Sequence, residues 1–217
     1  MAEARKPVRV AVNVMRARQT VVGFNIAIVS FQIAQISRLP GGLKVSGLEH
    51  AIHLRADIAL FTALALALLS LLALTISSEF DEVGYCTRWS LVAGDILMYL
   101  SLAHTVTGFF APLDFAFGEF AARVPTHAAA MAVLQTALRA VAGAAWFLAT
   151  YAGPLAALKQ SPFPRTTNIA LGIAYLALLM VLCWVGALSV QVETMDTGGQ
   201  PSLLLGVLKE LVQPFRW

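Results

Sequence analysis

Charged residues are scarce in this chain of 217 residues, because Asp, Glu, Lys and Arg together make up only 12% of it. A soluble globular domain contains about 25% charged residues and about 45–50% apolar ones. Here hydrophobic residues make up 59% of the sequence, which excludes an ordinary soluble domain. The net charge of +3 is typical of basic loops beside a membrane, and we expect no nucleic-acid partner.

Cysteines and enzyme motifs give little indication of chemistry. The two cysteines, Cys86 and Cys183, do not form a CxxC pair, so the sequence contains no redox motif. It also contains no HExxH, GxSxG, phosphate-binding loop or Gly-rich dinucleotide loop. Inverted half-repeats with interrupted helices, which mark many secondary transporters, are missing as well. We therefore do not expect a single-subunit enzyme.

Long apolar runs are the feature that the sequence does contain. Residues 58–76 hold no charge, and about 20 apolar residues are enough to cross a hydrocarbon core about 30 Å thick. Three similar runs follow, and Pro112 and Pro154 fall near the predicted ends of two of them. The pattern predicts an all-α polytopic membrane bundle of four transmembrane helices, at about Leu54–Ser77, Trp89–Pro112, His127–Leu155 and Thr167–Val190.

The bundle at residues 54–190 separates two other regions. Residues 1–53 form a basic N-terminal region in which Arg9, Asn13 and Arg16 recur at helical spacing, as in an amphipathic helix that rests on headgroups. Residues 191–217 form a cytoplasmic tail with a second, short amphipathic helix. The segment LDFAFGEFAARVP, between the second and third spans, is rich in Phe and is predicted to lie at the membrane interface.

The segment Thr20–Ile36 is ambiguous. It is only marginally long enough to cross, and Asn25 and Gln32 share one helical face, which suits either an interfacial helix or a span packed against protein. Without a crossing here, eleven Lys and Arg residues lie on one side of the membrane and three on the other; with a crossing the split is eight against six. The positive-inside rule therefore favours four spans in an inner membrane with both termini cytoplasmic, and five spans remain the alternative.

Four ionisable residues fall within the spans: Asp57, Asp95, His104 and Arg139. Each costs at least about 2.5–3.5 kcal/mol at the middle of a bilayer unless it is compensated. In antiparallel helices Asp95 and Arg139 fall at similar depth. We therefore expect them to pair, either to fix the register of the helices or to line an ion path.

His104 lies nine residues after Asp95, which places the two on opposite faces of the second span. A helix with polar groups on opposite faces is surrounded by protein, so the second span is predicted to be the centre of the bundle or a subunit contact. The third span carries small residues spaced four apart, Ala140 with Ala144 and Ala145 with Ala149, which allow close helix contacts within or between chains.

Three functional hypotheses follow. The first is a homo-oligomeric membrane protein that forms an ion-conducting path, with Asp95, Arg139, His104 and Asp57 as its intramembrane polar residues. The second is an electron carrier that binds a b-type haem or a metal through His53, His104 and His127, although only His104 lies well within a span. The third is a non-catalytic structural subunit of a larger membrane complex.

Overall fold

The computed structural model describes residues 8–9, 12–36, 42–43, 51–78, 85–86, 89–194 and 202–212. Parts of the basic N-terminal region and of the predicted tail therefore lie outside the described residues. The described elements are short strands β1 (Val8–Arg9) and β2 (Tyr85–Cys86) and helices α1 (Val12–Gln35), α2 (Leu54–Ser78), α3 (Ser90–Arg123), α4 (Ala128–Phe147), α5 (Gly153–Lys159), α6 (Arg165–Glu193) and α7 (Leu203–Leu211).

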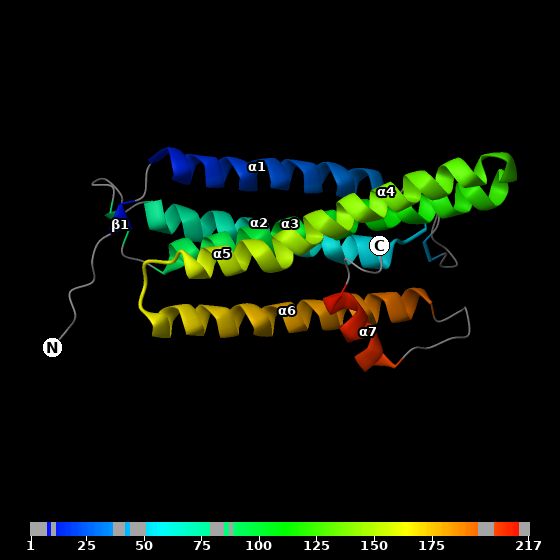
Figure 1. Cartoon of the computed structure of the whole chain (residues 1–217). Helices are drawn as coiled ribbons and strands as arrows, with labels where there is room; N and C mark the ends of the chain where they lie inside the picture. The colour runs from blue at the N-terminus through cyan, green and yellow to red at the C-terminus, as the bar shows by residue number, and fades with distance from the viewer. Residues whose placement is uncertain are drawn as a thin grey trace.

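The predicted all-α bundle is confirmed. In the described part of the chain, four helical stretches are long and apolar enough to cross a membrane: Leu54–Ser77, Ser90–Arg123, Pro125–Lys159 and Arg165–Glu193. The third of these joins α4 to α5 through a π-helical segment, Leu148–Ala152. Figure 1 shows the long helices aligned along one direction. The chain is therefore a multi-pass membrane protein.

Helix α3 is the centre of this bundle, as the sequence predicted for its second span, because it contacts α1, α2, α4 and α5. Its length differs from the prediction, since it runs unbroken through Pro112 to Arg123. A proline removes one backbone hydrogen bond, but neighbouring helices compensate for that loss in membrane helices. Helix α4 supplies such packing here, and Gln135 Nε2 donates to the carbonyl of Asp114 at 3.1 Å.

The segment after Pro112 is consequently a continuation of α3, and its place at the membrane interface stays a prediction. It forms a helical hairpin with the first turns of α4, and the hairpin projects beyond the other helices (Figure 1). The 34 residues of α3 correspond to about 51 Å at 1.5 Å per residue, well beyond a hydrocarbon core of about 30 Å. The hairpin tip therefore lies outside the apolar layer when the bundle spans it.

Helix α1 runs alongside α2 and α3 for its whole length. Near its start, Arg18 Nε lies 2.6 Å from Asp95 Oδ1 in the first turns of α3. In its middle, Asn25 Nδ2 donates to Ser101 Oγ at 2.7 Å, and Asn25 Oδ1 accepts from Thr105 Oγ1 at 2.8 Å. Its last residues belong to a buried cluster that also contains Ala56 and Leu60 near the start of α2.

The outward face of α1 is apolar and its inward face carries the polar groups. Phe24, Ile28 and Phe31 are exposed, whereas Asn25 is only 3% exposed. This is the reverse of a soluble amphipathic helix and is typical of a helix with lipid on one side and protein on the other. Of the two interpretations of Thr20–Ile36, the structure favours a span packed against protein.

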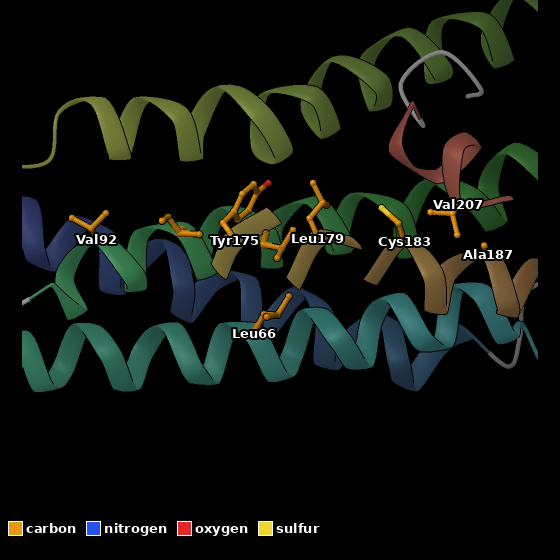
Figure 2. Close-up of a cluster of buried hydrophobic side chains, with 9 residues drawn as sticks. Leu66, Val92, Tyr175, Leu179, Cys183, Ala187 and Val207 are labelled. Atoms are coloured by element: carbon orange, nitrogen blue, oxygen red, sulfur yellow. The ribbon is translucent and has the colours of Figure 1, made fainter. Parts of the chain in front are cut away.

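Close approaches at glycines hold the central helices in register. A methyl group added at Gly94 would lie 2.8 Å from the Leu74 side chain, and one at Gly108 would lie 2.5 Å from that of Leu60. These contacts order α2 and α3 as an antiparallel pair. The largest buried cluster lies between α2, α3, α6 and α7, as Figure 2 shows, and includes Leu66, Leu100, Tyr175 and Leu179.

The arrangement of α1 predicts that the two chain ends lie on opposite sides of the membrane. Strand β1 pairs with β2 where α2 ends and α3 begins, whereas α7 lies at the opposite end of the bundle (Figure 1). The cytoplasmic placement of both termini is the competing prediction, and one experiment separates the two. Protease digestion of inside-out vesicles that carry the chain with a tag at each end should remove only one of the two tags. Removal or protection of both tags would instead mean that α1 does not cross.

The second prediction concerns Asn25, the buried amide that ties α1 to α3. Asn25→Leu keeps the side-chain size but removes two buried hydrogen bonds, and it should destabilise the folded chain by about 1 kcal/mol. Ser30→Ala, on the exposed face of α1, is the matched control and should have no measurable effect. Thermal unfolding in detergent measures both variants, and equal midpoints for the two would contradict the assigned role.

Candidate functional site

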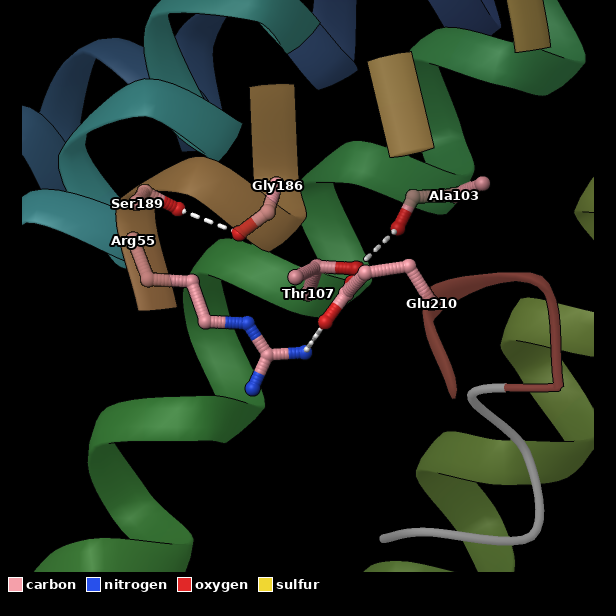
Figure 3. Close-up of polar contacts among 6 residues, drawn as sticks. All are labelled: Arg55, Ala103, Thr107, Gly186, Ser189 and Glu210. Carbon is pink, nitrogen blue, oxygen red and sulfur yellow. Dashed lines mark hydrogen bonds and ion pairs between the residues drawn. The ribbon is translucent and has the colours of Figure 1, made fainter. Parts of the chain in front are cut away.

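A buried ion pair closes the end of the bundle at which α7 lies. Arg55, in the first turn of α2, places Nη2 3.1 Å from Glu210 Oε1 of α7, and the Glu210 side chain is 7% exposed. The backbone N–H of Arg55 donates to Glu193 Oε1 at the end of α6, at 2.8 Å. Figure 3 shows Glu210 reaching from α7 to Arg55, with Thr107 of α3 drawn beside them. Three helices distant in sequence therefore meet at Arg55, α7 at its guanidinium and α6 at its backbone N–H.

Local sequence explains how α7 delivers Glu210 to this position. The Ser202 side chain caps the helix by accepting from the N–H of Leu205. Gly206 packs against Ala187, and a methyl group at Gly186 would lie 3.3 Å from Glu210 Oε2. The two glycines thus allow α7 to lie close to α6, and Val207 joins the buried cluster beneath it. Glu210 is carried inward as a consequence.

An open cleft lies on the outer side of Arg55. Its polar lining consists of His53, Arg55, Asp114, Glu193 and Thr194, and Pro112 and Phe115 of α3 form part of its wall. His53 is buried. The polar side chains of the cleft come from α2, α3 and α6, so it opens at the end of the bundle where those helices meet.

A narrow inner cavity lies on the other side of Arg55, between α2, α3, α4, α6 and α7. Its polar lining includes Arg55, His104, Thr107, Thr150, Cys183 and Glu210, and the rest is mainly apolar. Arg55 lines both spaces, whereas Glu210 lines only the inner cavity of the two. Arg55 therefore stands between the outside of the bundle and a mainly apolar cavity within it.

Two polar atoms on this lining are buried and lack a hydrogen-bond partner among the described residues: Thr150 Oγ1 and Arg55 Nε. Thr150 lies in the π-helical segment, and Pro154 has no N–H to donate to the Thr150 carbonyl four residues earlier. Tyr175 Oη of α6 donates to that carbonyl instead. The fully buried hydroxyl of Thr150 thus lies on the cavity wall in a segment of irregular backbone. Such π-helical turns are frequent at functional sites.

The predicted pairing of Asp95 with Arg139 is wrong. Asp95 pairs with Arg18, and Arg139 Nε lies 2.7 Å from Asp114 Oδ1. Asp114 is 19 residues further along α3 than Asp95, and at 1.5 Å per residue this separates the two pairs by about 28 Å. The cause is the continuation of α3 past Pro112, which moves the turn into α4 outward and shifts the register of α4 against α3.

The other polar residues predicted from the sequence, His104 and Asp57, lie in different parts of the bundle. His104 lines the inner cavity, on the face of α3 opposite to Asp95, as its spacing predicted. Asp57, one turn after His53 in α2, lies near enough to His53 and Glu193 to interact with them electrostatically. The structure therefore places Asp57 near two residues that line the open cleft and His104 on the inner cavity, and it leaves Asp95 outside both spaces.

The three histidines proposed for haem do not fit that group. Gly108 of α3 packs between Ala56 and Leu60 of α2, so this register places His53 about 14 Å from His104 along the bundle axis. Two axial haem ligands instead face each other at matching depth. His127 is exposed in the turn at the hairpin tip. The described residues also contain no cluster of three His, Cys, Asp or Glu side chains suited to a metal ion.

Sequence reasoning missed five residues that these contacts make important: Arg18, Arg55, Asp114, Glu193 and Glu210. Three of them were assigned to interfacial or tail segments, where a charge is ordinary. For Glu210 one signal was available, because it shares an α7 face with Val207 and the helix is otherwise almost entirely apolar.

Comparison of the chain with protein-family models, with curated proteins and with solved structures finds no match.

A double-substitution cycle tests the ion pair. Arg55→Leu leaves Glu210 buried without its cationic partner and should destabilise the chain by about 3 kcal/mol, the low end for buried pairs because Arg55 keeps 23% exposure. Arg55→Leu/Glu210→Leu removes both charges and should recover most of that loss. Chemical denaturation in mixed micelles gives the free energy of unfolding.

The matched control is Arg123→Leu, which breaks the exposed Arg123–Glu119 pair within α3 and should change stability by less than about 0.5 kcal/mol. A double variant no more stable than Arg55→Leu would show that the two side chains are not energetically coupled.

Proposed function

We propose that this membrane protein forms an ion-conducting path that is entered from the α7 end of the bundle. The observation that carries the proposal is that Arg55, which binds Glu210, lines both the open cleft and the inner cavity. Charged side chains are rare in apolar bundles because their burial is costly, and where they occur they commonly line polar pathways. Here Arg55 and Glu210 line the inner cavity, and Arg55 also lines the external cleft.

The balance of charge at this junction favours cations. The guanidinium of Arg55 binds the carboxylate of Glu210, the carboxylate of Glu193 accepts from the backbone N–H of Arg55, and Asp57 lies nearby. The second carboxylate of the cleft, Asp114, is neutralised by Arg139. An excess of negative charge in a cleft with apolar walls raises the local concentration of cations.

The far end of the inner cavity is closed in this conformation. Leu100 and Leu179 belong to both its lining and the buried cluster drawn in Figure 2, which continues through Tyr175 to Val92 at the start of α3. Helix α6 packs chiefly on α2 and α7. Conduction in this proposal therefore requires α6, with α7 attached, to move relative to α3, in the manner of a gated bundle.

Self-association is part of the proposal because a single small bundle encloses little space. Ala137, Ala140 and Ala144 lie exposed on the outer face of α4, whereas Ala149 is buried within the chain. Of the two small-residue pairs, Ala140 with Ala144 is thus available to a second copy.

The test is cation flux into liposomes that contain the purified chain. Glu193→Gln removes one carboxylate at the junction and should lower cation flux several-fold relative to the unsubstituted chain. Glu119→Gln is the matched control, because Glu119 belongs to the exposed pair on the hairpin and lines neither space. Flux no higher than in protein-free liposomes would reject the proposal and leave the structural-subunit hypothesis, whose signature is co-purification with partner proteins.

A further inference from the structure

We infer that the ion admitted to the inner cavity is the proton, relayed by His104 between water molecules held by Thr107, Thr150 and Arg55. This inference rests on the proposed ion path and names the species that it carries. It starts from the chemistry of the inner cavity, which differs from that of the outer cleft.

The polar lining of the cavity is too poor in oxygen for a metal cation. Sodium or potassium in a protein needs several oxygen ligands that replace its hydration shell. The inner lining offers the hydroxyls of Thr62, Thr107 and Thr150, and the one carboxylate, Glu210, is already bound to Arg55. Of these hydroxyls, that of Thr107 donates to the Ala103 carbonyl at 3.2 Å.

The same lining suits water. Thr150 Oγ1 and Arg55 Nε are buried polar atoms with no partner in the described part of the protein, and such atoms are normally satisfied by ordered water. Thr150 itself is fully buried. An unpartnered hydroxyl and an unpartnered N–H at different places on one cavity wall therefore indicate two points at which water is held.

In depth along α3, His104 lies between these two points, because Gly153, three residues after Thr150, packs on Tyr99, whereas Ala56 of α2 packs on Gly108. Its cavity also receives Thr107, one helical turn closer to the Arg55–Glu210 pair, and Thr150 from the facing π-helical segment. An imidazole accepts a proton on one nitrogen and releases one from the other, so it passes a proton along a line of water without a net change in its own protonation. The charged or titratable side chains that share this lining are Arg55 from α2, Cys183 from α6 and Glu210 from α7.

The experiment measures proton and metal-cation flux in the same liposomes. The full chain is reconstituted with a pH-sensitive dye inside, and a potassium diffusion potential drives proton entry; sodium and potassium flux are measured in parallel. We expect proton entry above that of protein-free vesicles without comparable sodium or potassium entry. Replacement of the His104 imidazole in His104→Ala should lower proton entry roughly tenfold or more.

Two further variants separate a relay from a structural role. His127→Ala, in the exposed turn of the hairpin, is the matched histidine control and should leave proton entry unchanged. Thr150→Val keeps the side-chain shape and removes the unpartnered hydroxyl, so it should lower proton entry as well. Added imidazole should restore proton entry in His104→Ala, which a merely misfolded variant would not allow.

The outcomes are distinguishable. Sodium or potassium entry as fast as proton entry would overturn the proton assignment and leave the ion path standing. Proton entry that is unaffected in His104→Ala would overturn the role of His104. An absence of flux for all three ions in the unsubstituted chain would reject the proposed function, and this inference with it.

Discussion

A polar group placed between apolar helices has to find its partner within the protein, because lipid offers none. In this chain that constraint acts mainly through α3. Asp95 and Thr105 bind α1, Ser101 donates to a carbonyl of α2, and Asp114 binds α4. Each partner comes from a different direction around α3, which is why this helix lies at the centre and why the others are held at defined depths against it.

The same constraint determines where sequence reasoning succeeds. Hydropathy locates the four spans because a hydrocarbon core demands about 20 apolar residues whatever the neighbours are. Hydropathy does not decide whether α1 crosses the membrane, because Asn25 lowers the hydropathy of this segment. The Asn25 side chain instead forms a tertiary hydrogen bond with α3. Charge counting points the other way for α1, because it treats Arg18 as a loop residue, whereas Arg18 pairs with Asp95 inside the bundle.

The partners of buried charges are less predictable than their presence. Asp95, Arg139 and His104 stand out in the sequence because they interrupt apolar runs. Which pairs form depends on helix register, and the register of α4 depends on whether α3 ends at Pro112. Sequence rules favour an end there, but the contact between Gln135 and the Asp114 carbonyl belongs to the packed hairpin and cannot be seen in either segment alone. The Arg55–Glu210 contact is still more remote, since it joins residues 155 positions apart.

The two ends of the bundle differ in a way that bears on how an ion would cross it. At the β1–β2 end, Ser77 and Ser90 bind each other between neighbouring helices, and Asp95 pairs with Arg18. At the α7 end, Arg55 meets its carboxylates at a junction of two spaces, and α7 is held there by Glu210 and by the hydrogen bond from Tyr151 Oη to the Leu211 carbonyl. Both anchors of α7 lie beside the inner cavity. Displacement of α7 would therefore remove Glu210 from Arg55 and open the cavity at the same time, so the helix that closes the cavity is also the one that completes the charge balance of the proposed path.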